Sequence, residues 1–381
     1  MDPISLDGTS TPSRAVNPMR GTARGGAPVP LSLLDLVTVS SGSTAADAVR
    51  TTTELAVLAE SLGYHRMWVA EHHSMPDIGS SSPAVLLAHL AAHTTTIRLG
   101  TGGVMLPNHP PLVVAEQFGM LEALHAGRFD LGIGRAPGTG PVAMAALRRS
   151  SVDLEELLDE LIGFLDGAFP EGDPLAGVHA VPGPIQARAR GGTGTFSRPP
   201  VWMLGSSERG ARLAGRRGLP FALAYHLEPD NLTAALQAYR DSFRPSAVLD
   251  APYAIVSVWV VAAETRARAE QLMRAAGLGV LWMMKGEPSL VPSPEEAERH
   301  PYTDADEEII RSALGHVIHG EPAEVRDRLT RLAEASGADE LMLVTHVPGH
   351  HDRLRSYELI AAAYGMSSAA ATEGRVAGEL R

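Results

Sequence analysis

Eight short apolar segments of β type, separated by segments of helical pattern, constrain the fold of this chain more than any other feature. Near-continuous apolar strands are buried on both faces, as in parallel sheets, and the connections between them are long enough for helical crossovers. The alternation predicts an α/β protein with a (β/α)8 TIM barrel, which 381 residues of 44% hydrophobic content can form as one domain. The predicted strands are Leu31–Val39, Arg66–Ala70, Ile97–Thr101, Phe129–Gly134, Val201–Leu204, Phe221–Ala224, Ala254–Ala262 and Glu340–Val344.

The main alternative fold is an open, doubly wound sheet, which should have fewer strands and a clear dinucleotide-binding fingerprint. The closest match to that fingerprint is Gly132-Ile-Gly134-Arg-Ala-Pro-Gly138. Its third glycine is misplaced, and Pro137 interrupts the start of the helix that should follow. The barrel is therefore the preferred prediction.

Two connections are too long for plain barrel loops, and they predict insertions before strand 5 (169–200) and after strand 7 (277–320). The second contains a capping-box pattern at Ser293–Glu296 and a helical pattern at Asp304–Ala313. An insertion after strand 7 lies on the catalytic face of a barrel, so we interpret it as a possible lid, with a structural excursion as the alternative.

The two ends of the chain have no hydrophobic period. The region 1–30 is rich in Gly, Pro, Ser, Thr and Arg. We therefore expect flexible tails at 1–30 and 367–381 around a barrel at 31–366.

Composition narrows the chemistry. The absence of cysteine excludes disulfides, thiolate metal sites and a cysteine nucleophile. Lys285 is the only lysine and lies in a segment that we interpret as a loop, which argues against Schiff-base catalysis. A net charge of −12 argues against nucleic acid as a partner, and the sequence shows neither a membrane-spanning apolar segment nor a secretory signal. We expect a cytoplasmic protein that acts on small molecules.

Active sites of barrels lie where the strands end at their C-terminal face. The polar or small residues at those positions are Glu71, His72 and His73 after strand 2, Gly102 and Gly103 after strand 3, Arg135 after strand 4, Ser206 and Ser207 after strand 5, His226 after strand 6 and His346 after strand 8. No carboxylate pair follows strands 4 and 7, so a glycosidase is poorly supported.

The segment Leu204–Arg212 places a strand, a tight turn, two hydroxyls and a helix start in succession. A helix N-terminus offers unpaired N–H groups to an anion, and Ser206 or Ser207 can add a hydroxyl, so the segment is typical of a phosphate site. An ordinary serine cap is the alternative, and Arg135 could likewise be a structural ion-pair partner.

Other strand-end residues suit catalysis and a flat ligand. His72 has a side chain suited to proton transfer near neutral pH, although a lone histidine is more often a core residue. Gly102 and Gly103 permit a bulge or the close approach of a flat ligand to the backbone.

Four stretches in this chain together resemble a known family: Val69-Ala-Glu-His-His73, Leu99-Gly-Thr-Gly-Gly-Val-Met-Leu-Pro-Asn-His-Pro110, Gly127-Arg-Phe-Asp-Leu-Gly-Ile-Gly-Arg135 and Val201-Trp-Met-Leu-Gly-Ser-Ser207. They are similar to the bacterial luciferase-like family of flavin-dependent monooxygenases, especially members associated with natural-product tailoring. The resemblance extends over most of residues 31–365.

This resemblance implies a TIM barrel that binds reduced FMN at its C-terminal face. It implies that Arg135, Ser206 and Ser207 hold the phosphate of FMN, and that the backbone near Gly210 helps to bind the same phosphate. Gly102 and Gly103 would lie against the isoalloxazine, where the family has a non-proline cis peptide, which glycine hinders least.

The resemblance also assigns roles to the histidines. His72 aligns with the family's catalytic histidine, and Glu71 and His73 would orient it or support the cofactor pocket. A reactive cysteine of bacterial luciferase is replaced here by Gly134, which does not favour aldehyde-dependent light emission.

The leading hypothesis is a two-component monooxygenase. Reduced FMN from a separate flavin reductase would react with oxygen, and the peroxyflavin would oxidise a small organic substrate, with natural products as one candidate class. By resemblance we also expect a homodimer through the helices after strands 2 and 3, including Ser82–Ala92.

Three alternatives stay open. The first is hydride transfer with a reduced deazaflavin, which related barrels bind. The second is a metal-dependent barrel hydrolase with His72, His73, His226 and His346 as possible ligands. The third is a flavin-binding protein without catalytic activity.

Overall fold

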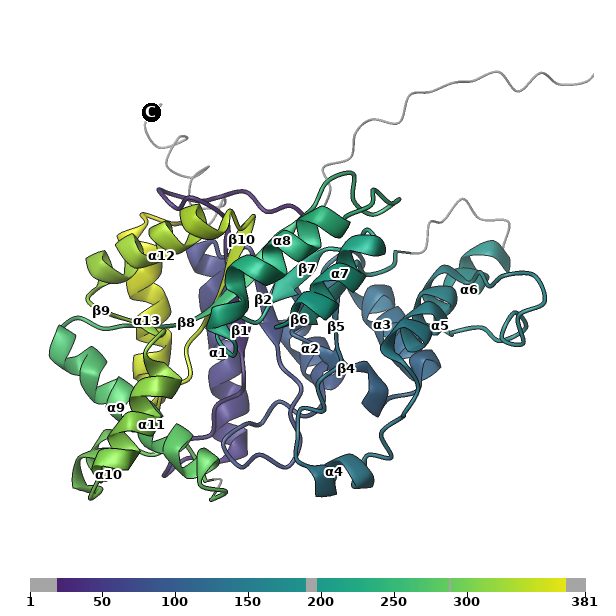
Figure 1. Cartoon of the computed structure of the whole chain (residues 1–381). Helices are drawn as coiled ribbons and strands as arrows, with labels where there is room; N and C mark the ends of the chain where they lie inside the picture. Colours follow the sequence, from purple (N-terminus) through teal and green to yellow (C-terminus); the bar gives the residue numbers. More distant parts are fainter. Residues whose placement is uncertain (1–18, 190–196, 288, 368–381) are drawn as a thin grey trace, which may run out of the picture.

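Eight parallel strands close into a barrel in the computed structural model, which describes residues 19–189, 197–287 and 289–367 (Figure 1). The last strand pairs with the first, Leu341 beside Leu31, and also with the seventh, which closes the sheet. The prediction of a (β/α)8 barrel is confirmed. The barrel strands are β1 (Leu31–Asp35), β2 (Arg66–Val69), β3 (Arg98–Thr101), β5 (Phe129–Gly134), β6 (Val201–Gly205), β7 (Phe221–Leu223), β8 (Ala254–Ala262) and β10 (Glu340–Val344).

Helices surround the barrel, and most connect successive strands. Two short strands, β4 (Val104–Met105) and β9 (Ile318–Gly320), pair with β5 and β8. The helices are α1 (Ala45–Leu62), α2 (Pro83–His93), α3 (Pro111–Leu124), α4 (Pro141–Ala146), α5 (Leu154–Asp166), α6 (Pro184–Ala189), α7 (Glu208–Arg216), α8 (Leu232–Ser242), α9 (Arg266–Met284), α10 (Pro294–Arg299), α11 (Asp304–Leu314), α12 (Pro322–Ser336) and α13 (His350–Ala363).

The core explains why these segments are strands. Side chains such as Met67, Leu99 and Leu131 are buried and belong to the apolar layer between the strands and the surrounding helices. Inside the barrel, the rings of Trp68 and Trp202 pack edge to face with centroids 5.2 Å apart. Strands buried on both sides need apolar residues at consecutive positions, as the sequence has.

A buried ion-pair network lies within the barrel at the N-terminal ends of its strands. Arg66 donates to Asp130 at 2.8 Å and to Glu340 at 2.9 Å, and all three side chains are fully buried. Arg98 also contacts Asp130, at 2.6 Å. Because these charges compensate one another far from the strand C-termini, the network is structural.

The predicted insertion after strand 7 is helical, but its predicted start at residue 277 falls inside α9. Helices α10 and α11 pack against α9 through a cluster that includes Leu278, Leu281 and Ala297. The helical pattern at 304–313 is confirmed as α11, and the capping box is present at Ser293. In Figure 1, α9, α10 and α11 gather at the same lower end of the barrel as α4.

The loop predicted around Lys285 is wrong in part. Residues 282–284 belong to α9, and Lys285 itself caps the C-terminus of that helix. Its ammonium group pairs with Asp306 of α11 at 2.7 Å. The packing of α9 on its two neighbours therefore extends the helix beyond the point that the sequence pattern indicates.

The first predicted strand is also shorter than expected, because β1 ends at Asp35. The chain then crosses the barrel mouth with isolated bridges from Thr38 to Ile78 and from Ser40 to Val291. The first bridge connects the β1 loop to the loop after β2, and the second connects it to the segment that follows α9.

Residues 19–30 contact the barrel: Met19 is buried, and Gly26 donates its N–H to the Tyr364 carbonyl at 2.7 Å. Residues 1–18 and 368–381 lie outside the described residues, as do 190–196 in the insertion before strand 5. The division into two tails and a barrel stays a prediction. Within the described ranges, none of the helices has the length and apolar character needed to cross a membrane.

Candidate functional site

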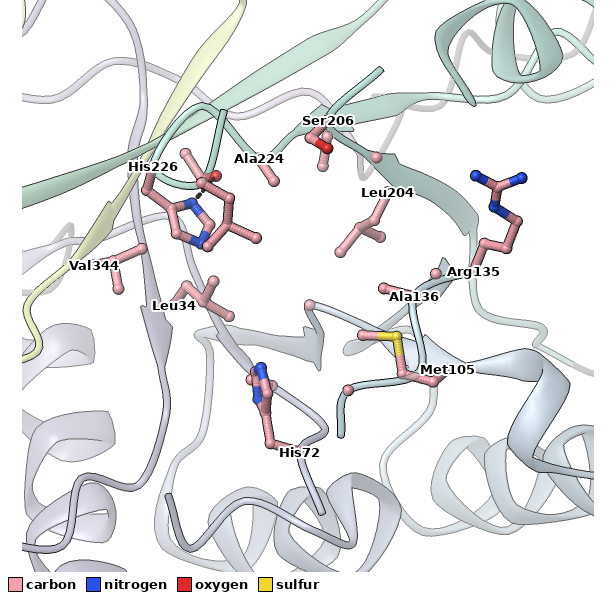
Figure 2. Close-up of a pocket in the computed structure, with 18 of the residues that line it drawn as sticks. Leu34, His72, Met105, Arg135, Ala136, Leu204, Ser206, Ala224, His226 and Val344 are labelled. Carbon is pink, nitrogen blue, oxygen red and sulfur yellow. Dashed lines mark hydrogen bonds between the residues drawn. The ribbon is translucent and has the colours of Figure 1, made fainter. Parts of the chain in front are cut away.

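A cavity of about 790 Å³ opens at the C-terminal ends of the barrel strands. This volume is within the range of small-molecule and cofactor sites. Most of the predicted site residues line it, namely His72, Gly102, Arg135, Ser206, Ser207 and Gly210. Figure 2 shows Arg135 and His226 on opposite sides of the cavity, with Leu204 and Ala224 between them.

One end of the cavity is formed by the N-terminus of α7. Ser207 occupies the cap position with an extended backbone, φ −126° and ψ 157°, but its side chain makes no capping hydrogen bond to the helix. The turn is held by Asn231, which donates to the Ser206 carbonyl at 2.9 Å. Among the residues that the structure describes, neither serine hydroxyl has a hydrogen-bond partner, so these hydroxyls and the first N–H groups of α7 can bind an anion. An ordinary serine cap does not describe this geometry.

Four arginines line the same end, and three of them have acidic partners. Arg209 pairs with Asp153 at 3.4 Å, Arg212 with Glu208 at 2.8 Å and Arg216 with Glu155 at 3.6 Å; these are exposed pairs.

Arg135 differs from the other three, because its guanidinium has no hydrogen bond or ion pair recorded with any described residue. It is exposed on the loop after β5 and points along the cavity wall in Figure 2. The structure therefore does not favour a structural ion pair for Arg135 and leaves one positive charge available to a ligand.

The peptide bond between Gly102 and Gly103 is cis, as the resemblance led us to expect. Gly102 lines the cavity, whereas Gly103 lies behind it. A Cβ atom on Gly102 would be 2.7 Å from Leu34 Cδ1, and one on Gly103 would be 2.7 Å from the Gly132 carbonyl oxygen. Position 103 therefore has no room for a side chain, whereas a side chain at position 102 would displace the end of Leu34, and Gly102 presents bare backbone to the cavity.

His72 lies on the cavity wall with a free side-chain nitrogen. Its backbone N–H donates to the Ser80 carbonyl at 2.8 Å, and its Nδ1 atom is buried without a hydrogen-bond partner among the described residues. Burial lowers the pKa of His72 below its ordinary value, against a smaller opposing effect of the Asp77 carboxylate. The imidazole is therefore neutral at pH 7 and can accept a proton.

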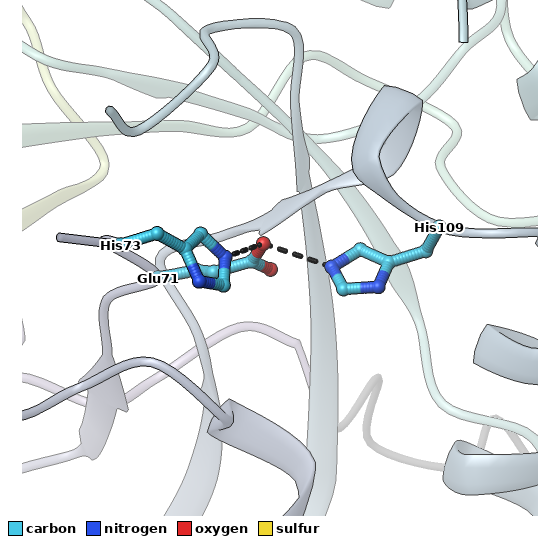
Figure 3. A group of neighbouring side chains, drawn as sticks. All are labelled: Glu71, His73 and His109. Carbon is cyan, nitrogen blue, oxygen red and sulfur yellow. Dashed lines mark hydrogen bonds and ion pairs between the residues drawn. The ribbon is translucent and has the colours of Figure 1, made fainter. Parts of the chain in front are cut away.

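Glu71 and His73, predicted to be catalytic or supporting, do not line the cavity. Glu71 is fully buried behind it, where its Oε1 atom accepts from His73 Nε2 at 2.9 Å and from His109 Nε2 at 2.8 Å (Figure 3). Met105 donates its N–H to Oε2 at 3.1 Å. Burial alone would raise the pKa of Glu71, but hydrogen bonds from His109 and His73 hold it below its usual range.

This cluster continues to the end of the cavity that contains Arg135. Asn108 donates to Glu71 at 3.4 Å and accepts from Arg149 at 2.8 Å, and Arg149 donates to the backbone carbonyl of Arg135. Sequence reasoning did not single out Asn108 or Arg149, and it gave His109 no role. The sequence feature that could have indicated Asn108 and His109 is their position just after strand 3, in a stretch that carries the family resemblance.

The four histidines considered as metal ligands are not brought together. Within the described ranges, the one group of His, Cys, Asp or Glu donors close enough to hold an ion is Glu71, His73 and His109. Of these only His73 was among the four. The carboxylate in that group is already saturated by N–H donors, so hydrogen bonding accounts for its geometry.

A parallel barrel with an open helix N-terminus, an arginine without an acidic partner among the described residues and a half-buried neutral imidazole around one cavity is typical of an enzyme that binds a phosphorylated cofactor. Residues 29–340 match the model of the luciferase-like monooxygenase family. The chain belongs to this family, and it is an oxidoreductase.

Individual relatives agree with the family match. A protein of Escherichia coli K12 named luciferase-like monooxygenase is 42% identical over 332 residues, which covers 87% of this chain and 96% of the relative. The N-acetyl-S-alkylcysteine monooxygenase of Bacillus subtilis strain 168 is 34% identical over 343 residues, covering 87% of this chain and 97% of the relative. The crystal structure of apo-MsnO8 is 37% identical with a TM-score of 0.78, covering 89% of this chain and 98% of that one.

Two more distant structures share the fold and differ in cofactor. The oxygenating constituent of 3,6-diketocamphane monooxygenase from Pseudomonas putida, in complex with FMN, is 22% identical with a TM-score of 0.66 and covers 88% of this chain and 98% of that one. An F420-dependent secondary alcohol dehydrogenase is 14% identical with a TM-score of 0.62 and covers 88% of this chain and 99% of that one.

Proposed function

We propose that this protein is the oxygenase of a two-component system, which takes reduced FMN from a separate flavin reductase and uses dioxygen to oxidise a small, predominantly apolar organic substrate. The observation that carries the proposal is the arrangement of one cavity. The end that contains Arg135 and the N-terminus of α7 lies apart from the half-buried neutral imidazole of His72, and the walls between them are mostly apolar.

The residues present fit FMN. The hydroxyls of Ser206 and Ser207, the first N–H groups of α7 and the guanidinium of Arg135 would hold the phosphate. The bare backbone at Gly102 offers a flat contact to the isoalloxazine. When bound, reduced FMN supplies the two electrons needed to activate dioxygen.

The protein's own residues then have three tasks. His72, neutral and with an unpartnered Nδ1 atom, would accept or hold a proton beside the reacting groups. Leu34, Met105 and Val344 present apolar surface that excludes water. The cluster around Glu71 would position His72 through its chain neighbours and Arg135 through Arg149.

The insertion also contributes to the cavity, because Val280 and Met283 of α9 and Val291 beyond it lie in the wall. We retain the proposal that 277–320 serves as a lid over the substrate. Its support is this position at the mouth, together with the bridge between Ser40 and Val291.

The homodimer is likewise part of the proposal. Large apolar side chains are exposed on α2 and α3, the helices expected at the interface: Val85 is 73% exposed, Met120 50% and Leu124 58%. Exposed apolar residues that gather on neighbouring helices are typical of subunit contacts.

Oxygen consumption tests the proposed reaction. A flavin reductase, NADH and catalytic FMN would be supplied with and without the native protein, and with the Arg135→Ala, Ser206→Ala, Ser207→Ala triple variant. We expect the native protein to sequester reduced FMN and slow its free oxidation, and the triple variant to leave that rate unchanged. Equal rates in all three samples would contradict the proposal, and hydride transfer without oxygen from reduced F420 would favour the deazaflavin alternative.

A further inference from the structure

The cavity end opposite Arg135 contains a second imidazole, that of His226, which follows β7. Its Nδ1 atom lies 2.7 Å from the Ser257 hydroxyl oxygen, and its backbone N–H donates to the Ser257 carbonyl at 3.0 Å. Figure 2 shows the ring at the cavity wall, close to Leu34 and Val344. The side chain is therefore fixed by β8 and presents its other edge to the cavity.

The hydrogen bonds of Ser257 determine which ring nitrogen carries the proton. The Ser257 hydroxyl donates its one hydrogen to the Leu223 carbonyl at 2.9 Å, so toward His226 it can only accept. Nδ1 of His226 must then be the N–H donor. Burial lowers the pKa of His226 to about 4, so the ring is neutral at pH 7 and its Nε2 atom carries a lone pair. No hydrogen bond from the described residues is recorded for Nε2.

The charges around this end define what it can bind. The four arginines that line the cavity are Arg135, Arg209, Arg212 and Arg216, and they belong to the opposite end, at the β5 loop and α7. The lining carboxylate of Asp77 faces His346, with 3.4 Å between its Oδ2 atom and Nε2 of the imidazole. A substrate carboxylate or sulfonate would therefore find no fixed cation among the described residues at this end.

We propose that the His226 end of the cavity binds the substrate, and that it selects neutral, largely apolar molecules carrying one hydroxyl or N–H group, which donates a hydrogen bond to His226 Nε2. The inference rests on the proposed function, in which the Arg135 end holds the cofactor phosphate. It adds a substrate class and a specificity-determining residue. Trp259, Val280 and Met283 add apolar surface to the same cavity.

Three probes of the same ring system test the class by calorimetry on the full-length protein. These are 2-naphthol, which has a neutral donor, 2-methoxynaphthalene, which has none, and 2-naphthoate, which is anionic. We expect 2-naphthol to bind about 3- to 10-fold more tightly than the methyl ether, as one hydrogen bond allows, and naphthoate to bind more weakly than both.

The His226→Phe variant should bind the two neutral probes equally. The His351→Phe variant, which changes an exposed histidine on α13, is the matched control and should keep the preference for 2-naphthol. Anaerobic binding of reduced FMN should be unchanged in both variants, and that measurement shows that His226→Phe has folded. In native protein with labelled histidine, nitrogen NMR should find the His226 proton on Nδ1.

The inference would be overturned if the native protein bound the two neutral probes equally, bound neither of them, or preferred 2-naphthoate. It would also be overturned if the His226 proton were found on Nε2. Retention of the naphthol preference in His226→Phe would also overturn it. A native protein that fails to bind reduced FMN would instead refute the proposed function.

Discussion

The sharpest consequence of the cavity geometry concerns Arg135, the lining arginine without a recorded ionic partner. Hydrogen bonds to charged groups contribute about 1.5–3 kcal/mol each, and a tenfold change in affinity corresponds to about 1.4 kcal/mol. The Arg135→Ala variant should therefore bind FMN about 10- to 100-fold more weakly than the native protein. It should bind riboflavin, which has no phosphate, with unchanged affinity.

The assay is a fluorescence titration of both flavins, oxidised for convenience and reduced under anaerobic conditions for confirmation. Arg212→Ala is the matched control, because Arg212 lines the same end but is already paired with Glu208 at 2.8 Å. We expect this control to weaken FMN binding less than about threefold. An unchanged FMN affinity in Arg135→Ala, or a parallel loss of riboflavin affinity, would refute the phosphate assignment.

Further predictions concern the imidazoles, the buried carboxylate and the dimer. The His72→Gln variant should bind reduced FMN with native affinity, but its rate of substrate oxidation should be at least about tenfold lower. In the native protein, the turnover rate should be constant above pH 7 and should fall as the pH drops through the lowered pKa of His72. The pKa of His226 is lowered to about 4 in the folded protein, so the imidazole binds a proton more readily in the unfolded chain. The contribution of His226 to the free energy of unfolding should therefore be constant above pH 6.5. It should decrease by up to roughly 3 kcal/mol as the pH falls toward 4. Urea unfolding of native protein and His226→Phe at pH 5 and 7 checks this, and an equal pH dependence in both would contradict it. The Glu71→Gln variant should lose about 1–3 kcal/mol of stability and bind FMN more weakly, because the hydrogen bonds from two histidines lose their charged acceptor; unchanged melting and FMN affinity would count against a positioning role. The Val85→Asp, Leu124→Asp double variant should be monomeric by light scattering, and a retained dimer mass would place the interface elsewhere.

Much of the barrel could be predicted because its strands are buried on both faces and leave long apolar runs. The strand ends also indicated His72, Gly102, Arg135 and Ser206, and all four line the cavity, since parallel strands bring their C-terminal ends to one face. The same reasoning predicted a first strand that is four residues longer than β1. The reason is that Val37 and Val39 are buried beyond the end of the strand and do not belong to the sheet.

The roles of Glu71 and His73 were harder to predict. In an extended segment, alternate side chains point to opposite sides. Glu71 and His73 therefore share one side, and His72 takes the other. That alternation was available in the sequence and separates the cavity residue from its two neighbours.

What completes the Glu71 cluster was not available from local pattern. His109 and Asn108 reach Glu71 across more than 35 positions in the chain, and Arg149 reaches Asn108 across 41. Such contacts depend on how the loops after strands 2, 3 and 4 fold over one another. The same is true of the Ser257 hydroxyl that fixes the proton on His226.

Anaerobic titration of the native protein with reduced FMN, and separately with reduced F420, measures which reduced cofactor this cavity binds. We expect saturation at one reduced FMN per chain, with clearly weaker binding of reduced F420. Tighter binding of reduced F420, or no saturable binding of reduced FMN, would contradict it.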